Sequence, residues 1–160
     1  MSESLRTRLT RHAFNFWPAI WGTGSRITYI ASDWREMRVE VPLRLRTRNY
    51  VGTIFGGSMY AAVDPWYMIM LIKNLGPDYV VWDKAASIRF LRPGRSTLSA
   101  RFLLEEAELE AIRKALETER SVDRVYPVEL VDREGTVCAR VEKTVYVRKA
   151  REHAGGEPSR

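Results

Sequence analysis

The residues best suited to chemistry lie between positions 49 and 64. Asn49 is followed by Phe55-Gly56-Gly57, and Asp64 lies farther along, inside an apolar run. Two adjacent glycines at the start of a helix let a ligand reach backbone N–H groups that are unpaired and carry partial positive charge. A carbonyl placed there would be polarised, and a developing oxyanion would be stabilised. Asp64 could then act as a general base on water or as a nucleophile, with Asn49 orienting the water or the carbonyl.

Each of these residues also has a purely structural interpretation. Gly56 and Gly57 could form a tight loop before a packed helix, and Asn49 is of a type common in turns. Asp64 precedes Pro65, so it could cap a helix that begins at the proline. However, an acid flanked by Ala-Ala-Val and Trp-Tyr-Met-Ile-Met is costly to bury without a purpose. We therefore expect Asp64 to serve catalysis or ligand binding.

The helices that must position these residues follow from hydrophobic periodicity. Residues 58–75 are apolar almost all round, which predicts a buried central helix. Residues 105–119 predict a short surface helix whose charges suit its dipole. Residues 5–21 predict an amphipathic helix that lies on another part of the fold. Its apolar face would hold Leu5, Leu9, His12, Phe16 and Ile20.

Strand patterns surround the central helix on both sides. Apolar or alternating runs predict strands at 26–31, 36–41, 80–91, 97–104, 125–131 and 136–148. One apolar helix among about six strands implies an α+β fold in which an antiparallel sheet curls around that helix. We expect a single domain over residues 1–149 and a polar, disordered tail over 150–160.

Motif and strand order together resemble the hotdog-fold acyl-CoA thioesterases of the phenylacetate-pathway (PaaI-like) type. Their motif has an Asn, then His-Gly-Gly at the mouth of the central helix, then an acid within it, and Asn49, Gly56, Gly57 and Asp64 match it in order. Phe55 stands where the His would be. The chain is similar here to an uncharacterised branch of the superfamily that commonly shows Gly-Thr-x-Phe-Gly-Gly. The resemblance covers roughly residues 5–149.

The resemblance implies hydrolysis of an acyl-CoA-type thioester. Asp64 would be the base or nucleophile, Gly56 or Gly57 would donate a backbone N–H to the oxyanion, and Asn49 would orient. No metal or redox cofactor is implied, and coenzyme A enters only as part of the substrate. Phe55 could wall the acyl pocket, or it could mark a binding protein that has lost catalysis. A dehydratase is disfavoured because such enzymes pair a His with an acid, and the two histidines of this chain, His12 and His153, lie near its ends.

Spacing within the motif predicts an oligomer. Gly56 and Asp64 are eight residues apart, which is about 12 Å along a helix at ~1.5 Å per residue. One helix cannot easily offer both groups to the same carbonyl carbon, whereas two antiparallel helices in a dimer can. We expect a homodimer, or a homotetramer made by pairing dimers.

Apolar and basic residues near the motif suggest how the substrate is held. Met59 and Tyr60 could line an acyl tunnel, because Met adapts to irregular shapes, but general core packing is the favoured interpretation, since apolar helix faces usually pack. Arg89, Arg92 and Arg95 flank Pro93-Gly94 and suit the phosphates of coenzyme A. A solvated basic edge that discourages strand pairing is the alternative.

Composition limits the remaining classes. The 160 residues include 26 Lys plus Arg against 20 Asp plus Glu, a net charge of +6 that suggests an anionic partner. Nucleic acid is disfavoured because the aromatic residues lie mostly on segments that look buried. A single cysteine, Cys138, excludes an intrachain disulfide framework and any metal site built from cysteines. No apolar stretch is long enough to span a bilayer, so we expect a cytoplasmic protein with no membrane partner.

Overall fold

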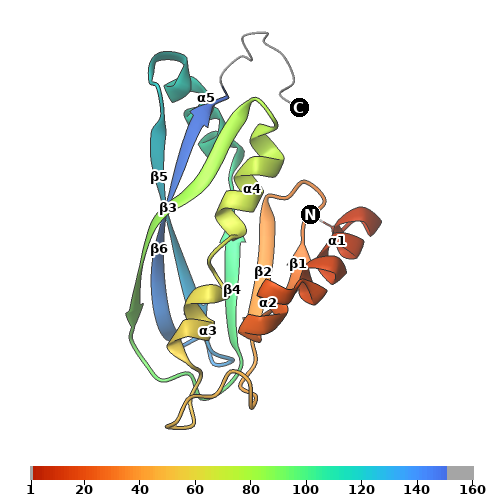
Figure 1. The fold of residues 1–160 in the computed structure, drawn as a ribbon, viewed down its shortest axis with the longest axis vertical. Helices are drawn as coiled ribbons and strands as arrows, with labels where there is room; N and C mark the ends of the chain where they lie inside the picture. Colours follow the sequence, from red (N-terminus) through yellow and green to blue (C-terminus); the bar gives the residue numbers. More distant parts are fainter. Residues whose placement is uncertain (1, 151–160) are drawn as a thin grey trace, which may run out of the picture.

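The computed structural model describes residues 2–150, in which helices and strands alternate (Figure 1). The helices are α1 (Leu5–Phe16), α2 (Pro18–Thr23), α3 (Gly56–Ala61), α4 (Trp66–Leu75) and α5 (Glu106–Thr118). The strands are β1 (Arg26–Ile30), β2 (Glu36–Val41), β3 (Tyr79–Phe90), β4 (Leu98–Leu103), β5 (Val122–Val131) and β6 (Val137–Lys149). The predicted tail at 150–160 lies outside the described residues, except for Ala150, whose N–H donates to the carbonyl of Asp78 (2.7 Å).

The strands form one six-stranded sheet in the order β1-β2-β4-β5-β6-β3, with antiparallel neighbours throughout. The sheet curves around α3 and α4, which run along its inner face (Figure 1). This arrangement confirms the α+β hotdog fold. Along the strands, alternate side chains face inward and make the core. The pattern in β2 predicts this for Met37, Val39 and Val41, which are all buried.

One edge of the sheet is long and open. β3 has 12 residues and pairs with β6 along one side. Within residues 2–150 no strand pairs with its other side. Ala85, Ala86 and Ser87 in its middle are exposed. An exposed strand of this length is a ready template for pairing with another chain.

The central helix is confirmed, and Pro65 divides it into α3 and α4. Proline has no N–H to donate to the preceding turn, so the helix cannot continue through it. A turn at 62–65 results, and the indole of Trp66 donates to the carbonyl of Ala62 across it (2.7 Å). Asp64 lies in this turn and not within a helix. The sequence alternative in which Asp64 caps the next helix is not realised, because α4 begins after Pro65 with no side-chain cap.

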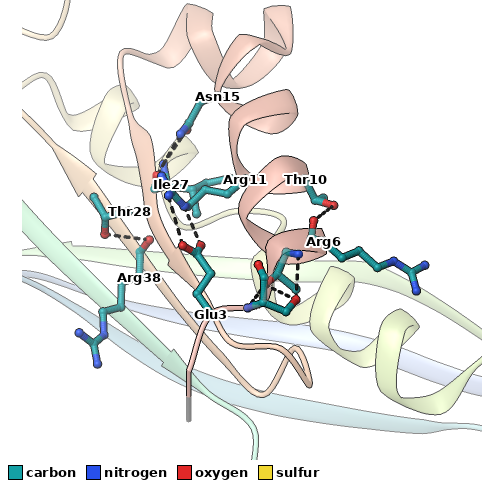
Figure 2. Close-up of polar contacts among 10 residues, drawn as sticks. Glu3, Arg6, Thr10, Arg11, Asn15, Ile27, Thr28 and Arg38 are labelled. Carbon is teal, nitrogen blue, oxygen red and sulfur yellow. Dashed lines mark hydrogen bonds and ion pairs between the residues drawn. The ribbon is translucent and has the colours of Figure 1, made fainter.

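The predicted apolar face of the N-terminal helix is wrong. Residues 5–21 form two helices that break at Trp17-Pro18, and Leu5, Leu9 and Phe16 are exposed while Ile20 alone of the predicted apolar set is buried. Polar contacts hold α1 instead (Figure 2). Asn15 bonds the edge strand twice, donating to the carbonyl of Ile27 (2.9 Å) and accepting from its N–H (2.7 Å). These bonds substitute for a neighbouring strand at that position of β1, which periodicity cannot reveal.

The surface helix α5 agrees with its prediction. Leu109, Ile112 and Leu116 are buried on one face, and Glu106 and Glu108 lie in its first turn. Glu108 accepts hydrogen bonds from Arg124 of β5 (2.8 and 2.5 Å) and from Tyr126 (2.8 Å). These bonds attach α5 to the sheet.

Candidate functional site

The loop before α3 is closed by Asn49. Its side chain accepts from the N–H of Thr53 (3.0 Å) and donates to the Thr53 hydroxyl (2.9 Å), and Gly52 adopts a φ of 85° in the turn between them. Both ends of the Asn49 amide are therefore engaged in the turn, as the structural alternative for this residue predicts. The turn directs the chain into Phe55, the N-cap of α3.

A cavity of about 430 Å³ lies at the start of α3. It brings together four of the residues singled out from the sequence: Asn49, Gly56, Met59 and Arg92. Its other walls are formed by the loop at Thr53-Ile54 and the segment that leaves β3. We name this hollow the glycine cavity.

A side chain at either glycine of the pair would meet the ring of a neighbouring phenylalanine, and the two rings are different. A Cβ on Gly56 would lie 2.7 Å from the ring of Phe90, and one on Gly57 would clash with the ring of Phe55. Phe55 itself is 56% exposed and lies over Gly57. Neither the glycine cavity nor the cavity that holds Asp64 includes Phe55 among its lining residues.

Asp64 lines a second cavity, of about 420 Å³, between the N-terminal helices and the central helices. Tyr60 also lines it, whereas Gly56, Asn49 and Arg92 do not. The remaining walls are mostly apolar: Phe14, Trp17, Ile20, Trp66 and Ile69 are among them. We name this hollow the Asp64 cavity. Within one chain, the two halves of the predicted site thus lie in different cavities.

The expected burial of Asp64 is wrong, and the reason is an ion pair that the sequence analysis missed. The Asp64 side chain is 43% exposed, and its Oδ1 accepts a hydrogen bond from Nζ of Lys143 on β6 (2.7 Å). Lys143 is only 1% exposed, and its Nζ also lies 3.3 Å from Oδ1 of Asp83 on β3. The acid therefore sits at the mouth of a polar cluster whose cation is in the core.

Two effects act in opposite directions on the charges of this cluster: burial disfavours the charged forms, and ion pairing favours them. Burial disfavours the charge of Lys143, but the hydrogen bond to Asp64 and the negative charges of Asp83 and Asp64 outweigh it and raise the pKa of Lys143. Burial raises the pKa of Asp83, and the attraction of Lys143 offsets this only in part. Burial and the neighbouring Asp64 carboxylate likewise raise the pKa of Tyr60.

A sequence signal for Lys143 exists. In the alternating strand 136–148, Val141, Val145 and Val147 share a face with Lys143, so a lysine occupies an otherwise apolar row. A lysine in such a row requires a buried partner. The identity of that partner depends on β3–β6 register, which the pattern alone does not fix.

The three predicted arginines are not gathered in one place. Arg92 lines the glycine cavity, Arg89 lines a separate hollow of about 200 Å³ with Arg140 and Glu142, and Arg95 is exposed. Elsewhere, His12 is exposed on α1, and Cys138 is buried in β6, where burial raises the pKa of its thiol. Among residues 2–150, no group of three or more His, Cys, Asp and Glu side chains is placed to hold a metal ion.

Sequence comparison assigns the chain to a family. Residues 6–147 match a family described as a domain of unknown function (DUF4442). The chain belongs to this family. No curated protein matches it at the level of sequence. In the part of the chain that the structure describes, no helix has both the length and the apolar character needed to cross a membrane.

Solved structures share the fold of this family member at low sequence identity. A Pseudomonas aeruginosa protein of unknown function, described as a probable thioesterase, is 17% identical with a TM-score of 0.79, covering 92% of this chain and 99% of its own. A Haemophilus influenzae thioesterase is 16% identical with a TM-score of 0.65, covering 97% of each chain. The Escherichia coli PaaI protein of the phenylacetic acid degradation operon is 17% identical with a TM-score of 0.58, covering 93% and 96%.

Proposed function

We propose that this protein hydrolyses a thioester of the acyl-CoA type. The observation that carries the proposal is the placement of Asp64, a partly exposed carboxylate held by a buried lysine at the wall of an apolar cavity. An acyl group suits the apolar walls, and a carboxylate beside it can activate water. The thioesterase names of proteins that share this fold add to the case.

The proposed reaction uses two groups of the chain. Asp64 takes a proton from a water molecule as its oxygen attacks the thioester carbonyl carbon. Negative charge moves to the carbonyl oxygen, where the N–H groups of Gly56 and Gly57 would stabilise it. When the C–S bond breaks, the thiolate of coenzyme A leaves and takes up a proton, and the acid product remains. Direct attack by Asp64, followed by hydrolysis of the resulting anhydride, is the alternative route.

A shared site in a homodimer reconciles the two cavities with this reaction. The glycine cavity and the Asp64 cavity are separate within one chain, so the two groups would meet on one substrate only when they come from different copies. The open edge of β3 is where a second copy would pair, continuing the sheet across the dimer. Light scattering of the purified protein would measure the dimer, or the tetramer that two dimers could form.

Complementation tests whether the site is shared. Gly56→Pro removes the N–H at the first position of α3, where proline is tolerated, so this chain should lose an oxyanion donor. Gly56→Pro and Asp64→Ala chains are expressed together with different tags, and the mixed dimer is isolated. In a two-fold dimer with shared sites, one site carries both changes and the other carries neither, so about half of the wild-type activity per dimer should return. If both groups act within one chain, each site keeps one change and no activity returns.

Hydrolysis itself is tested with short, medium, long and aromatic acyl-CoAs and detection of the free thiol. Loss of a general base lowers kcat by roughly 10²- to 10⁴-fold, so Asp64→Ala should be nearly inactive while remaining folded and dimeric. Asp78→Asn is a matched control, because Asp78 is an exposed aspartate beyond the other end of α4. A wild type that releases no thiol from any substrate would refute the proposal.

Arg92 would bind the phosphates of coenzyme A at the glycine cavity. Arg92→Ala should raise KM for acyl-CoA but leave the KM for an N-acetylcysteamine thioester, which has no phosphate, unchanged. Arg120→Ala, which alters an exposed arginine after α5, is the control. Equal effects of Arg92→Ala on both substrates would contradict a phosphate contact.

A non-catalytic acyl-CoA binding protein is the second candidate, and Phe55 favours it. The residue that replaces the motif histidine lies exposed and away from the walls of both cavities, so it offers no polar group to a thioester. Calorimetric binding of acyl-CoA without thiol release would support this candidate.

A further inference from the structure

Lys143 is a buried cation whose position stability alone does not explain. Its side chain is 1% exposed. It extends from β6, which pairs with the edge strand β3, to the turn at 62–65 between the central helices. An apolar residue of similar volume in place of a buried ion pair is often as stable or more stable. The neighbours of Lys143 in its own row, Val141 and Val145, show that this face of β6 otherwise accepts apolar residues.

The two acids that share Lys143 are not equivalent. Asp64 is 43% exposed and lines the cavity, whereas Asp83 is 21% exposed and does not line it. Oδ1 of Asp83 is buried and forms no hydrogen bond among the described residues, although it lies 3.3 Å from the lysine. The lysine thus directs its short hydrogen bond at Asp64 and leaves Asp83 as an ionic neighbour.

Asp83 owes its place to an irregularity in β3. The pairing with β6 shifts between Asp83 and Ala85, so Lys84 is an extra residue in the strand. Such bulges bend a strand and re-aim its side chains, and they occur often beside functional sites. Lys84 points outward and pairs with Asp123 (2.5 Å), while Asp83 faces Lys143 inside.

Other titratable groups near Lys143 are few among the described residues. Tyr60 of α3 has its ring centre 5.7 Å from Nζ. Tyr126 of β5 lies opposite Lys143 in the strand register, but its hydroxyl is bonded to Glu108. The charged side chains that face Lys143 are therefore Asp64 and Asp83.

We propose that Lys143 and Asp83 are positioning residues for Asp64. Lys143 fixes the carboxylate on the turn between α3 and α4 through its hydrogen bond, and Asp83 faces the same ammonium group as a second negative charge. This role rests on the proposed hydrolysis. Neither residue lines the Asp64 cavity, so neither would contact a substrate bound there.

Two substitutions should shift the acidic limb of the pH profile of kcat/KM in opposite directions. An opposite charge at this distance favours the ionised carboxylate, so Lys143→Met should move the limb up by about 1 pH unit. Asp83→Asn should move it down by a smaller amount, because the lysine's charge then acts on Asp64 alone. Lys143→Arg keeps the charge and should leave the limb in place. A purely structural role would lower activity in these variants without opposed shifts, and that result would overturn the proposal.

A second measurement does not depend on turnover. Carboxyl carbon resonances of labelled protein are followed by NMR against pH, with Asp64→Asn identifying the Asp64 signal. The midpoint of this signal should fall in Asp83→Asn and rise in Lys143→Met. If Lys143→Met does not fold, Lys143→Arg is measured in its place, and the midpoint should be unchanged. Opposed shifts in a protein that releases no thiol would uphold the positioning and refute the hydrolysis. An unmoved midpoint in Asp83→Asn in an active enzyme would overturn the positioning alone.

Discussion

Removing Lys143 should expose how much of the fold's stability depends on one buried cation. Lys143→Met leaves Asp83 with a buried oxygen and no opposite charge, and breaking a buried pair costs about 3–5 kcal/mol. Asp64 adds little to this loss, because it is 43% exposed and can turn to water, and such pairs contribute roughly 0–1 kcal/mol. We therefore expect a loss near the lower limit, about 3 kcal/mol.

A double-mutant cycle separates the charge from the packing. Asp83→Asn alone should cost about 1–2 kcal/mol, since Lys143 keeps Asp64 as a partner. The double variant Asp83→Asn, Lys143→Met has no unpaired charge at the two substituted positions, so its loss should be well below the sum of the two. Coupling within such a network runs to about 0.5–3 kcal/mol, and we expect the upper half of that range.

Urea unfolding at a fixed protein concentration measures the cycle, with unchanged m-values as the check that the folded states are comparable. Lys84→Met is the matched control: Lys84 also pairs with an aspartate, but both partners are exposed, so its loss should stay within about 1 kcal/mol. Strictly additive losses at Lys143 and Asp83 would refute the reasoning. The same conclusion would follow if Lys143→Met cost no more than Lys84→Met.

The pH dependence of the same variant has a definite sign. Asp83 already has a raised pKa, and an acid that binds its proton more tightly in the folded state makes folding more favourable as pH falls. Loss of Lys143 removes the attraction that opposes this rise. The cost of Lys143→Met should therefore be smaller at pH 5 than at pH 8, and an equal cost at both would show that Asp83 is not the group left unpaired.

Three further substitutions test other parts of the fold. Gly24→Ala should cost more than about 1 kcal/mol by thermal unfolding, because φ is 78° and a Cβ would clash with Thr47; Gly135→Ala, also at positive φ (84°) but with open space, should cost less. Gly94→Ala should cost about 1–3 kcal/mol, because Leu98, Met59 and Ile54 lie within 3.0–3.3 Å of the new Cβ, and an unchanged melting temperature would contradict that packing. Burial opposes ionisation of Glu108, but hydrogen bonds from Arg124 and Tyr126 outweigh it and hold its pKa below the usual value. Its contribution is present above the unfolded pKa of about 4.3 and disappears as pH falls, so Glu108→Gln should flatten the loss of stability measured between pH 5 and pH 3.

The sequence predicts the elements well where periodicity and burial agree. β2 and α5 each have a buried face that their patterns identify, and the sheet around a central helix follows from them. It fails at α1, because the helix is held by hydrogen bonds from Asn15 to β1 and by Phe14, and not by the predicted face of Leu5, Leu9 and Phe16. Side-chain bonds to an edge strand leave no periodic signal.

The sequence does not predict how the candidate site residues are grouped in space. Gly56, Asn49 and Arg92 do meet in one cavity, yet Asp64 faces another. Pro65 predicts the break in the central helix, but not where the broken ends point. The direction of the Asp64 carboxylate is set by Lys143, 79 residues away in sequence. Such a contact depends on strand register, and a slip of one residue would turn every side chain of the strand to the other face.

Lys143 illustrates how a local conflict in sequence can point to a candidate functional position. A lysine in an apolar row of a strand contradicts the pattern around it, and natural sequences keep such conflicts mainly where function requires them. Here the conflict is resolved by two acids from distant segments, one brought inward by the extra residue at Lys84. The bulge, the buried lysine and the proline-broken helix each disturb regular structure, and all three act on the position of Asp64. A fold that needed only stability would be expected to remove at least one of them.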